Sequence, residues 1–285
     1  MVNQIKSVFL LGILSVILVY IGGFFGQEGL VVALILALAM NAFSYFFGDK
    51  LILTIYRAKE AGADQLPQVH RILRNLTQSA GLPLPRLYLI PTATPNAFAT
   101  GRDSRHASVA VTSGLLNLLT EEELEGVLAH ELSHVRNRDI LIATIAATIA
   151  SAITFLARML QMMAYFGTGR DDRREGNAFG LLAMLLFAVL APIAAMIIQL
   201  AISRSREYLA DETAARICGH PEYLSSALRK LSDAVRVRPM VSAHPSTAHL
   251  FIVNPFSVRS LMAIFSTHPP IEERIARLEA MAGRI

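Results

Sequence analysis

Two uncharged apolar segments near the amino terminus restrict the fold of this chain more than any other feature. Residues 7–27 and 30–48 contain no Asp, Glu, Lys or Arg and are dominated by aliphatic side chains. The first is long enough to cross roughly 30 Å of hydrocarbon as a helix. Together they predict a tight transmembrane hairpin that turns around Glu28. A signal peptide is the alternative for residues 7–27, but no A-x-A cleavage site follows them and a second apolar segment begins at once.

A second pair of apolar segments lies further along the chain. Residues 140–157 are uncharged, Arg158 interrupts them, and apolar residues resume to Phe166, whereas residues 178–202 are uncharged throughout. We expect these segments to form the third and fourth transmembrane helices. A buried helical hairpin in a soluble core, or a pair of helices along the membrane surface, is the alternative, because Arg158 and Pro192 make both spans less regular.

Basic residues at the ends of the two pairs predict their orientation. Lys6 precedes the first pair and Lys50 and Lys59 follow it, while the connection between its two segments has no cation. The positive-inside rule then places both outer ends in the cytoplasm. The second pair is flanked in the same sense, by Arg136, Arg138, Arg204 and Arg206.

The composition supports a membrane protein and gives no sign of a nucleic-acid partner. Hydrophobic residues make up 53% of the chain and charged residues only 17%, and the mean hydropathy is +0.46. The net charge of +4 is explained by cations beside membrane segments, where anionic lipid attracts them. No basic stripe interleaved with aromatic residues or RNA-binding signature accompanies it. The single cysteine, Cys218, excludes an intramolecular disulfide framework.

The chemistry of the chain is indicated by the pentapeptide His130-Glu131-Leu132-Ser133-His134. Positions four apart lie on the same face of an α-helix, so the two imidazoles can bind one metal ion from the same side. The carboxylate of Glu131 then lies beside the metal, where it can activate a metal-bound water. This is the arrangement of the H-E-x-x-H motif of zinc metalloproteases, with Glu131 as the catalytic residue. Two surface histidines on an ordinary helix are the alternative.

The sequence around the pentapeptide predicts the helix that it needs. Thr120 and Glu123 form a capping-box pattern, so the helix should begin at about Glu121 and run past Arg136. Charged residues precede and follow the motif, and their burial in hydrocarbon would cost several kcal/mol each, of the order measured for single charges in membranes. The metal should therefore lie in water just outside the bilayer. An apolar stripe at helical spacing is formed by Leu124, Val127, Leu128 and Leu132.

Glu207 is the best candidate for a third metal ligand. Catalytic zinc is held by three protein ligands and keeps one position open. Glu207 and Asp211 are four residues apart and face the same way, so Glu207 can bind zinc while Asp211 accepts the free N–H of a ligating histidine. A surface Glu and Asp paired with neighbouring arginines is the alternative.

The remaining patterns predict a small α/β region divided by the second apolar pair. Helical spacing covers residues 61–80, 113–119, 203–219, 221–235 and 270–282. Short strands are expected at 86–90 and 108–112. Residues 94–100 should form an edge strand, because Pro95 cannot donate a hydrogen bond within a central ladder.

Four stretches together resemble the HtpX family of heat-shock membrane proteases, which is related to the zinc proteases that trim prenylated CAAX proteins. They are H-E-L-S-H, R-E-Y-L-A-D, P-N-A-F-A-T-G and T-H-P-P-I-E-E-R. The resemblance covers nearly the whole chain. It implies a zinc endopeptidase of the bacterial inner membrane that cleaves misfolded or damaged membrane proteins at the cytoplasmic face under stress. It also implies one zinc ion per subunit bound by His130, His134 and Glu207, with catalysis by Glu131.

The expected fold is therefore a mainly α membrane protein with a small β-sheet, in which four transmembrane helices accompany a zincin-like (gluzincin) protease domain. Residues 1–50 and 140–203 should form the two hairpins, and residues 51–139 and 204–285 the two parts of the protease domain. The expected partners are polypeptide substrates and the lipid bilayer. A rival hypothesis is a membrane-embedded binding or chaperone-like protein whose zinc is only structural, but a structural site is usually closed by four protein ligands.

Three further residues are weaker candidates for substrate or transition-state contacts. Asn96 and Ala97 resemble the edge-strand segment on which related proteases bind the substrate backbone, and strand addition holds an extended peptide without reading its side chains. An ordinary turn at Asn96 is the alternative. His268 could donate a hydrogen bond to the oxyanion of the tetrahedral intermediate, or it could cap the last helix.

Overall fold

A computed structural model of the chain describes residues 26–150, 204–237 and 269–283, together with scattered positions between residues 9 and 23 and with residues 250 and 252. Most of the first predicted transmembrane segment, all of the fourth, the second half of the third and His268 lie outside the described residues. The described chain is mainly helical and has one small mixed sheet. This agrees with the expected fold class, while the four transmembrane helices and the domain limits stay predictions.

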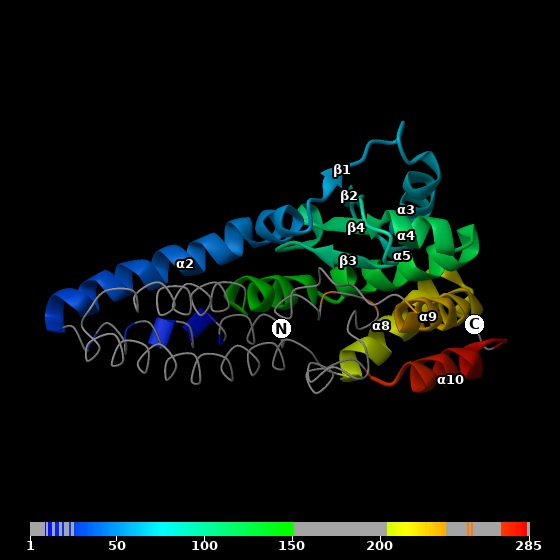
Figure 1. The fold of residues 1–285 in the computed structure, drawn as a ribbon. Coiled ribbons are helices and arrows are strands. Elements are labelled where there is room, and N and C mark those ends of the chain that lie inside the picture. Colours follow the sequence, from blue (N-terminus) through cyan, green and yellow to red (C-terminus); the bar gives the residue numbers. More distant parts are fainter. Residues whose placement is uncertain are drawn as a thin grey trace, which may run out of the picture.

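Helix α2 (Gly26–Ile55) carries the second predicted transmembrane segment and extends away from the sheet (Figure 1). Within the part of the chain that is described, it is the one helix long and apolar enough to cross a membrane. The predicted connection around Glu28 is instead the first turn of this helix. The helix also continues past Gly48, because Ile52 and Leu53 at its far end are buried against the sheet.

The sheet has four strands in the order β1-β2-β4-β3. Strands β2 (Arg86–Ile90) and β4 (Ser108–Thr112) are parallel and confirm both predicted strands. Strand β3 (Ala97–Thr100) pairs antiparallel with β4 and lies at the edge, as predicted, but it begins two residues after Pro95. Strand β1 (Lys59–Glu60) is too short to have been recognised in the sequence.

The predicted helices are present with small differences at their ends. Helix α3 (Pro67–Ala80) begins six residues later than expected, because Pro67 suits the first helical position, and it ends at Gly81 in the left-handed conformation with φ 65°. The other described helices are η1 (Ser104–His106), α4 (Ser113–Leu118), α5 (Glu121–Arg136), an apolar helix over Ile140–Ala150, α8 (Arg204–Cys218), α9 (Pro221–Val237) and α10 (Ile271–Met281).

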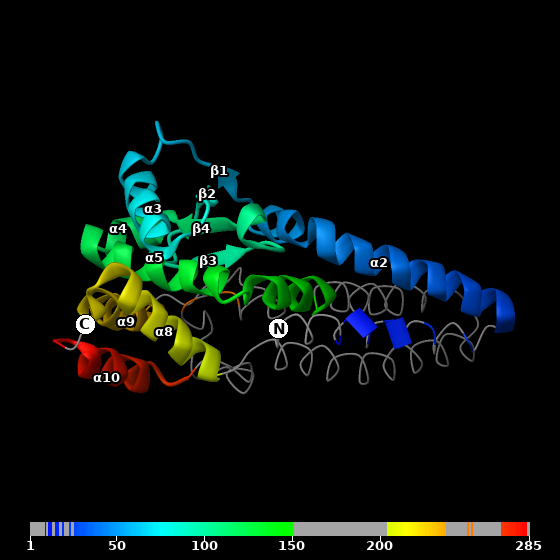
Figure 2. The ribbon, with the colours of Figure 1, turned by 180° about the vertical axis from the view of Figure 1, so that it is seen from behind.

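Helix α5 occupies the centre of the molecule, between the sheet and the pair formed by α8 and α9, with α10 beyond them (Figures 1 and 2). Both hydrogen bonds of the predicted capping box at Thr120 and Glu123 are present. Gly126 allows α9 to pack closely on α5, since a Cβ atom there would lie 2.5 Å from the backbone nitrogen of Leu224. Residues before and after the 140–203 segment therefore share one core.

Candidate metal centre

Two histidines on the buried face of α5 point toward each other. The Nε2 atoms of His130 and His134 are 3.2 Å apart, and the planes of the two rings are nearly perpendicular. The side chain of His130 is 1% exposed and that of His134 is 17% exposed. The i and i+4 positions thus present two ring nitrogens to one small space, as the helical spacing predicts.

Glu207 brings a carboxylate from α8 to the same space. Its Oε2 atom is 3.8 Å from Nε2 of His130, and its Oε1 atom is 3.7 Å from Nε2 of His134. Tetrahedral zinc with bonds of about 2.0–2.1 Å holds its ligand atoms about 3.4 Å apart. The three side chains offer ligand atoms that all lie within 4.8 Å of one another. Two imidazoles and one carboxylate at these separations fit a single zinc ion.

A carboxylate holds the outward nitrogen of each histidine ring. Asp211 Oδ1 lies 3.0 Å from Nδ1 of His130, and Asp139 Oδ2 lies 3.1 Å from Nδ1 of His134. With a proton on Nδ1, each ring leaves Nε2 free to bind a cation. The sequence suggested this contact for Asp211 but not for Asp139. Arg138 has φ 60°, and this turn brings Asp139 back beside the last turn of α5.

The electrostatics of the pair favour a positive charge between the two rings. Burial lowers the pKa of His134, but the hydrogen bond to Asp139 and the negative charges of Glu207 and Glu131 outweigh it and raise that pKa to about 9. Burial lowers the pKa of His130, against the opposing effect of its hydrogen bond to Asp211. A space that favours a proton on one of two facing imidazoles also favours a metal cation that replaces it.

Glu131 lies on the neighbouring face of α5, beside the edge strand. Its Oε2 atom accepts a hydrogen bond of 2.8 Å from the backbone N–H of Ala99 in β3. Burial of its carboxyl group and the negative charge of Glu207 raise the pKa of Glu131 to about 8, against the opposing effect of His134. A carboxylate with this pKa can both accept and release a proton near neutral pH.

Arg274, on α10, lies at the centre of the site and was not recognised in the sequence. Its side chain is 0% exposed. It donates hydrogen bonds of 2.7 and 2.8 Å to the two carboxylate oxygens of Asp211 and one of 3.1 Å to the carbonyl of Ile252. Arg274 therefore fixes the carboxylate that in turn orients His130. The signal was available, because Arg274 ends the T-H-P-P-I-E-E-R stretch, of which only His268 was considered.

Asn96 directly precedes the edge strand, and Ala97 is the first residue of that strand. Asn96 is fully buried, and its Oδ1 atom accepts hydrogen bonds from the N–H groups of Ala97 and Ile252. Among the described residues, its Nδ2 atom has no hydrogen-bond partner. The N–H groups of Ala97 and Ala99 thus turn away from β4, toward the side on which a further strand could pair.

Comparison with known proteins identifies the family. The sequence pattern of "Peptidase family M48" matches residues 63–282. A "Protease HtpX homolog" of Syntrophobacter fumaroxidans is 55% identical over 280 residues, which cover 98% of this chain and 99% of the relative. Another protein of that name, from Pyrococcus furiosus, is 50% identical over 279 residues, covering 98% and 96%.

One solved structure shares the fold. The crystal structure of S. mikatae Ste24p matches with a TM-score of 0.53 at 19% identity, over 98% of this chain and 66% of that protein. The predicted resemblance to the HtpX family is confirmed, and the rival hypothesis of a binding protein with only structural zinc is not supported. The chain therefore belongs to peptidase family M48 and is a metalloprotease.

Proposed function

We propose that this protein is a membrane zinc endopeptidase in which one zinc ion per subunit is bound by His130, His134 and Glu207. The convergence of two Nε2 atoms and one carboxylate within 4.8 Å carries the proposal. Zinc bound there would polarise a peptide carbonyl and lower the pKa of a water molecule. Glu131 lies close enough to His134 and Glu207 for their charges to shift its pKa.

In this proposal Glu131 moves the proton between water and the leaving group. Its carboxylate accepts the proton of the attacking water and passes it to the nitrogen of the cleaved peptide bond. A pKa of about 8 suits both steps, because the carboxylate neither holds the proton too weakly to accept it nor too tightly to release it. The bond from Ala99 N–H to Oε2 keeps the carboxylate beside β3, where the substrate backbone would lie.

The edge strand β3 would bind the substrate as an added strand. The buried amide nitrogen of Asn96 is a donor suited to a carbonyl group of an extended peptide, and the outward N–H of Ala97 would exchange its bond to Asn96 Oδ1 for one to the peptide. Main-chain pairing accepts many sequences, which suits a protease that removes misfolded proteins. His268 as a donor to the oxyanion stays a prediction.

We place the site at the cytoplasmic surface of a cell membrane, the bacterial inner membrane in the HtpX interpretation. Helix α2 has the length and composition of a membrane span. Lys50 lies beside Asp49 near the carboxyl end of the helix, Arg57 and Lys59 follow that end, and the charged residue in the first turn is Glu28. This charge asymmetry favours a cytoplasmic protease domain. Misfolded or damaged membrane proteins would be the substrates within reach of such a site.

The test compares Glu131→Gln with a matched control, Glu125→Gln, which changes a carboxylate one and a half turns earlier on the same helix. Both purified proteins should contain one zinc per subunit by elemental analysis. Only Glu131→Gln should lose casein cleavage, by at least the roughly 100-fold expected for a general base. Cleavage at the wild-type rate by Glu131→Gln, or cleavage that persists after complete removal of zinc by a chelator, contradicts the proposal.

A further inference from the structure

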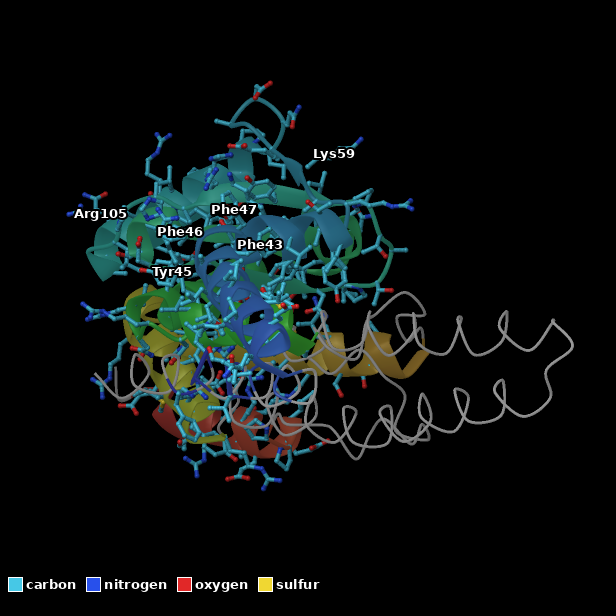
Figure 3. The ribbon with its side chains drawn as sticks, turned by 90° about the vertical axis from the view of Figure 1, so that its left-hand side faces the viewer. Phe43, Tyr45, Phe46, Phe47, Lys59 and Arg105 are labelled. Carbon is cyan, nitrogen blue, oxygen red and sulfur yellow. The ribbon has the colours of Figure 1, made fainter. Side chains whose placement is uncertain are left out.

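Four aromatic side chains are exposed together on one section of α2, just before it joins the protease domain. Phe43, Tyr45, Phe46 and Phe47 are between 38% and 51% exposed. Phe43 stacks on Phe47, and Tyr45 meets Phe46 edge to face. Figure 3 shows the four side chains at the end of the helix nearest the sheet. We call these four residues the aromatic belt.

Cations surround the aromatic belt. Lys50 Nζ lies 5.4 Å from the centre of the Phe47 ring, and Arg102 Cζ lies 5.6 Å from that of Phe46, both within cation–π range. Exposed Arg105 and Lys59 lie on opposite sides of the belt (Figure 3). We call these four cations the basic rim: Lys50, Lys59, Arg102 and Arg105.

The acidic residues nearby offset only part of this charge. Asp103 accepts hydrogen bonds from the backbone N–H groups of Arg105 and His106 and contacts the His106 ring at 2.8 Å, so its carboxylate is engaged within its own loop. It also lies 3.7 Å from Arg102. Asp49 and Glu60 lie next to Lys50 and Lys59 in the sequence. The four cations still exceed the three carboxylates, and Arg105 extends from the loop into solvent.

The aromatic belt lies at the carboxyl end of the apolar section of α2. Glu28 and Asp49 are the charged residues at the two ends of this section, with Lys50 directly after Asp49, and the helical rise from Glu28 to Asp49 is about 32 Å, close to the thickness of the hydrocarbon core. Exposed aliphatic side chains fill the first part of that length, and aromatic ones the last. Aromatic side chains favour the boundary between hydrocarbon and headgroups, with Lys and Arg just outside it.

We propose that the aromatic belt and the basic rim form a binding surface for anionic phospholipid headgroups. The occupant follows from chemistry, because a phosphate that carries net negative charge pairs with Arg102 and Arg105 while its acyl chains pack on the rings of α2. The proposal rests on the membrane location proposed above. It goes beyond that location because an apolar helix alone requires no particular lipid headgroup, whereas the basic rim favours anionic headgroups.

The surface is connected to the edge strand of the active site by a short path. Arg102 follows Gly101, whose N–H donates to Thr144 Oγ1 at 3.2 Å, and the hydroxyl of Thr100 lies 2.9 Å from the same oxygen. One residue earlier, Ala99 N–H bonds Glu131. A headgroup bound to Arg102 would therefore restrain the end of β3, the strand whose Ala99 N–H bonds Glu131.

The test uses the absence of tryptophan from the chain. Phe46→Trp introduces one indole at the belt, in the full-length protein in nanodiscs of mixed phosphatidylcholine and phosphatidylglycerol. Either lipid is supplied with brominated acyl chains, and quenching of the indole reports which lipid is its neighbour. We expect stronger quenching by brominated phosphatidylglycerol. In the Phe46→Trp protein, Arg102→Gln with Arg105→Gln should lower the preference for phosphatidylglycerol over phosphatidylcholine about five-fold per arginine.

Matched controls separate the basic rim from general charge. Arg216→Gln with Arg229→Gln removes two exposed arginines of α8 and α9, and it should leave the lipid preference unchanged. Inorganic phosphate should weaken the preference no more than sodium chloride at equal ionic strength. Stronger competition by phosphate would make the rim a site for free anions and overturn the lipid assignment.

Equal quenching by the two brominated lipids, or a preference that survives loss of both arginines, also overturns the proposal. The wild-type lipid comparison needs no arginine variant, so misfolding of that variant leaves the test intact. Casein cleavage measured in the same nanodiscs keeps the proposed function separate. Cleavage without lipid preference refutes only the lipid surface, and lipid preference without cleavage refutes only the enzyme assignment. An indole quenched by neither lipid refutes the membrane location and the lipid surface with it.

Discussion

Replacement of Arg274 by leucine should destabilise the metal-free protein by about 3–5 kcal/mol, the usual cost of removing one partner of a buried ion pair. Arg274 is 0% exposed, and Asp211 is 4% exposed, with two hydrogen bonds between them. Without the guanidinium, the Asp211 carboxylate keeps only its contact with His130 at 3.0 Å. The carbonyl of Ile252 also loses its donor.

The same reasoning predicts that a second substitution compensates in part. Asp211→Asn alone leaves Arg274 as an unpaired buried charge, whereas Arg274→Leu with Asp211→Asn leaves no charge unpaired. The loss in the double variant should therefore be smaller than the sum of the two single losses by at least about 1 kcal/mol, as for residues in direct contact.

Thermal unfolding in detergent measures both effects, with Cys218 as the one thiol available to a thiol-reactive dye. A loss of 3–5 kcal/mol corresponds to a fall in Tm of about 6–20 °C for a domain of this size. Arg277→Leu is the control on the same helix, because its side chain is 56% exposed and pairs with Glu273, so it should cost under about 1 kcal/mol. Equal Tm values for Arg274→Leu and Arg277→Leu, or strictly additive losses in the double variant, would refute the reasoning.

Three further predictions concern other contacts of α5. Gly126→Ala should lower the free energy of unfolding by about 1–3 kcal/mol, measured in the same thermal assay, because its Cβ would lie 2.5 Å from the backbone nitrogen of Leu224. Asp139→Asn should weaken zinc binding about 10–100-fold in competition with a chelating dye, since the ring of His134 loses its anionic partner; unchanged affinity would contradict that role. Burial acts to raise the pKa of Glu123, but hydrogen bonds from Lys230, the Thr120 N–H and Ser226 lower it below its ordinary 4.5. Its stabilising effect is therefore present at neutral pH and lost as the pH falls through the lowered pKa, so wild type and Glu123→Gln should converge in stability once the pH is below that pKa.

Local signals in the sequence were enough to place the elements that carry the site. Thr120 and Glu123 predicted the start of α5 correctly, because a capping box satisfies backbone N–H groups within four residues. The edge position of β3, which was predicted from Pro95, is confirmed, although Pro95 itself lies two residues before the strand. The length of α2 was not predicted, since the burial of Ile52 and Leu53 against the sheet depends on residues distant in the chain. The later start of α3 follows from Pro67, a local signal that was overlooked.

The site itself was predictable as far as residue type and helical spacing determine it. His130 and His134 lie four residues apart on one helix, and Glu207 and Asp211 repeat that spacing on another, so each pair shares a face whatever the tertiary structure. The contacts that orient the rings depend on tertiary structure. Asp139 reaches His134 only because Arg138 turns the chain at φ 60°, a conformation that the sequence does not suggest for arginine.

Arg274 shows that the metal ligands alone do not describe the site, because charged side chains that contact the ligands' hydrogen-bond partners also matter. In the sequence it is one of several arginines on an amphipathic helix, and exposure is the usual expectation for that residue type. In the structure it is fully buried, because Asp211 and the carbonyl of Ile252 replace its hydration. The buried Asp211 carboxylate accepts the N–H of His130 on one side and needs a positive charge on the other, which Arg274 provides. Three acidic groups, Glu131, Glu207 and Asp211, lie around the site, and Arg274 is a permanent cation that offsets part of their negative charge. The helix α10 that supplies it should thus be as necessary for a folded metal site as α5 and α8, which supply the ligands.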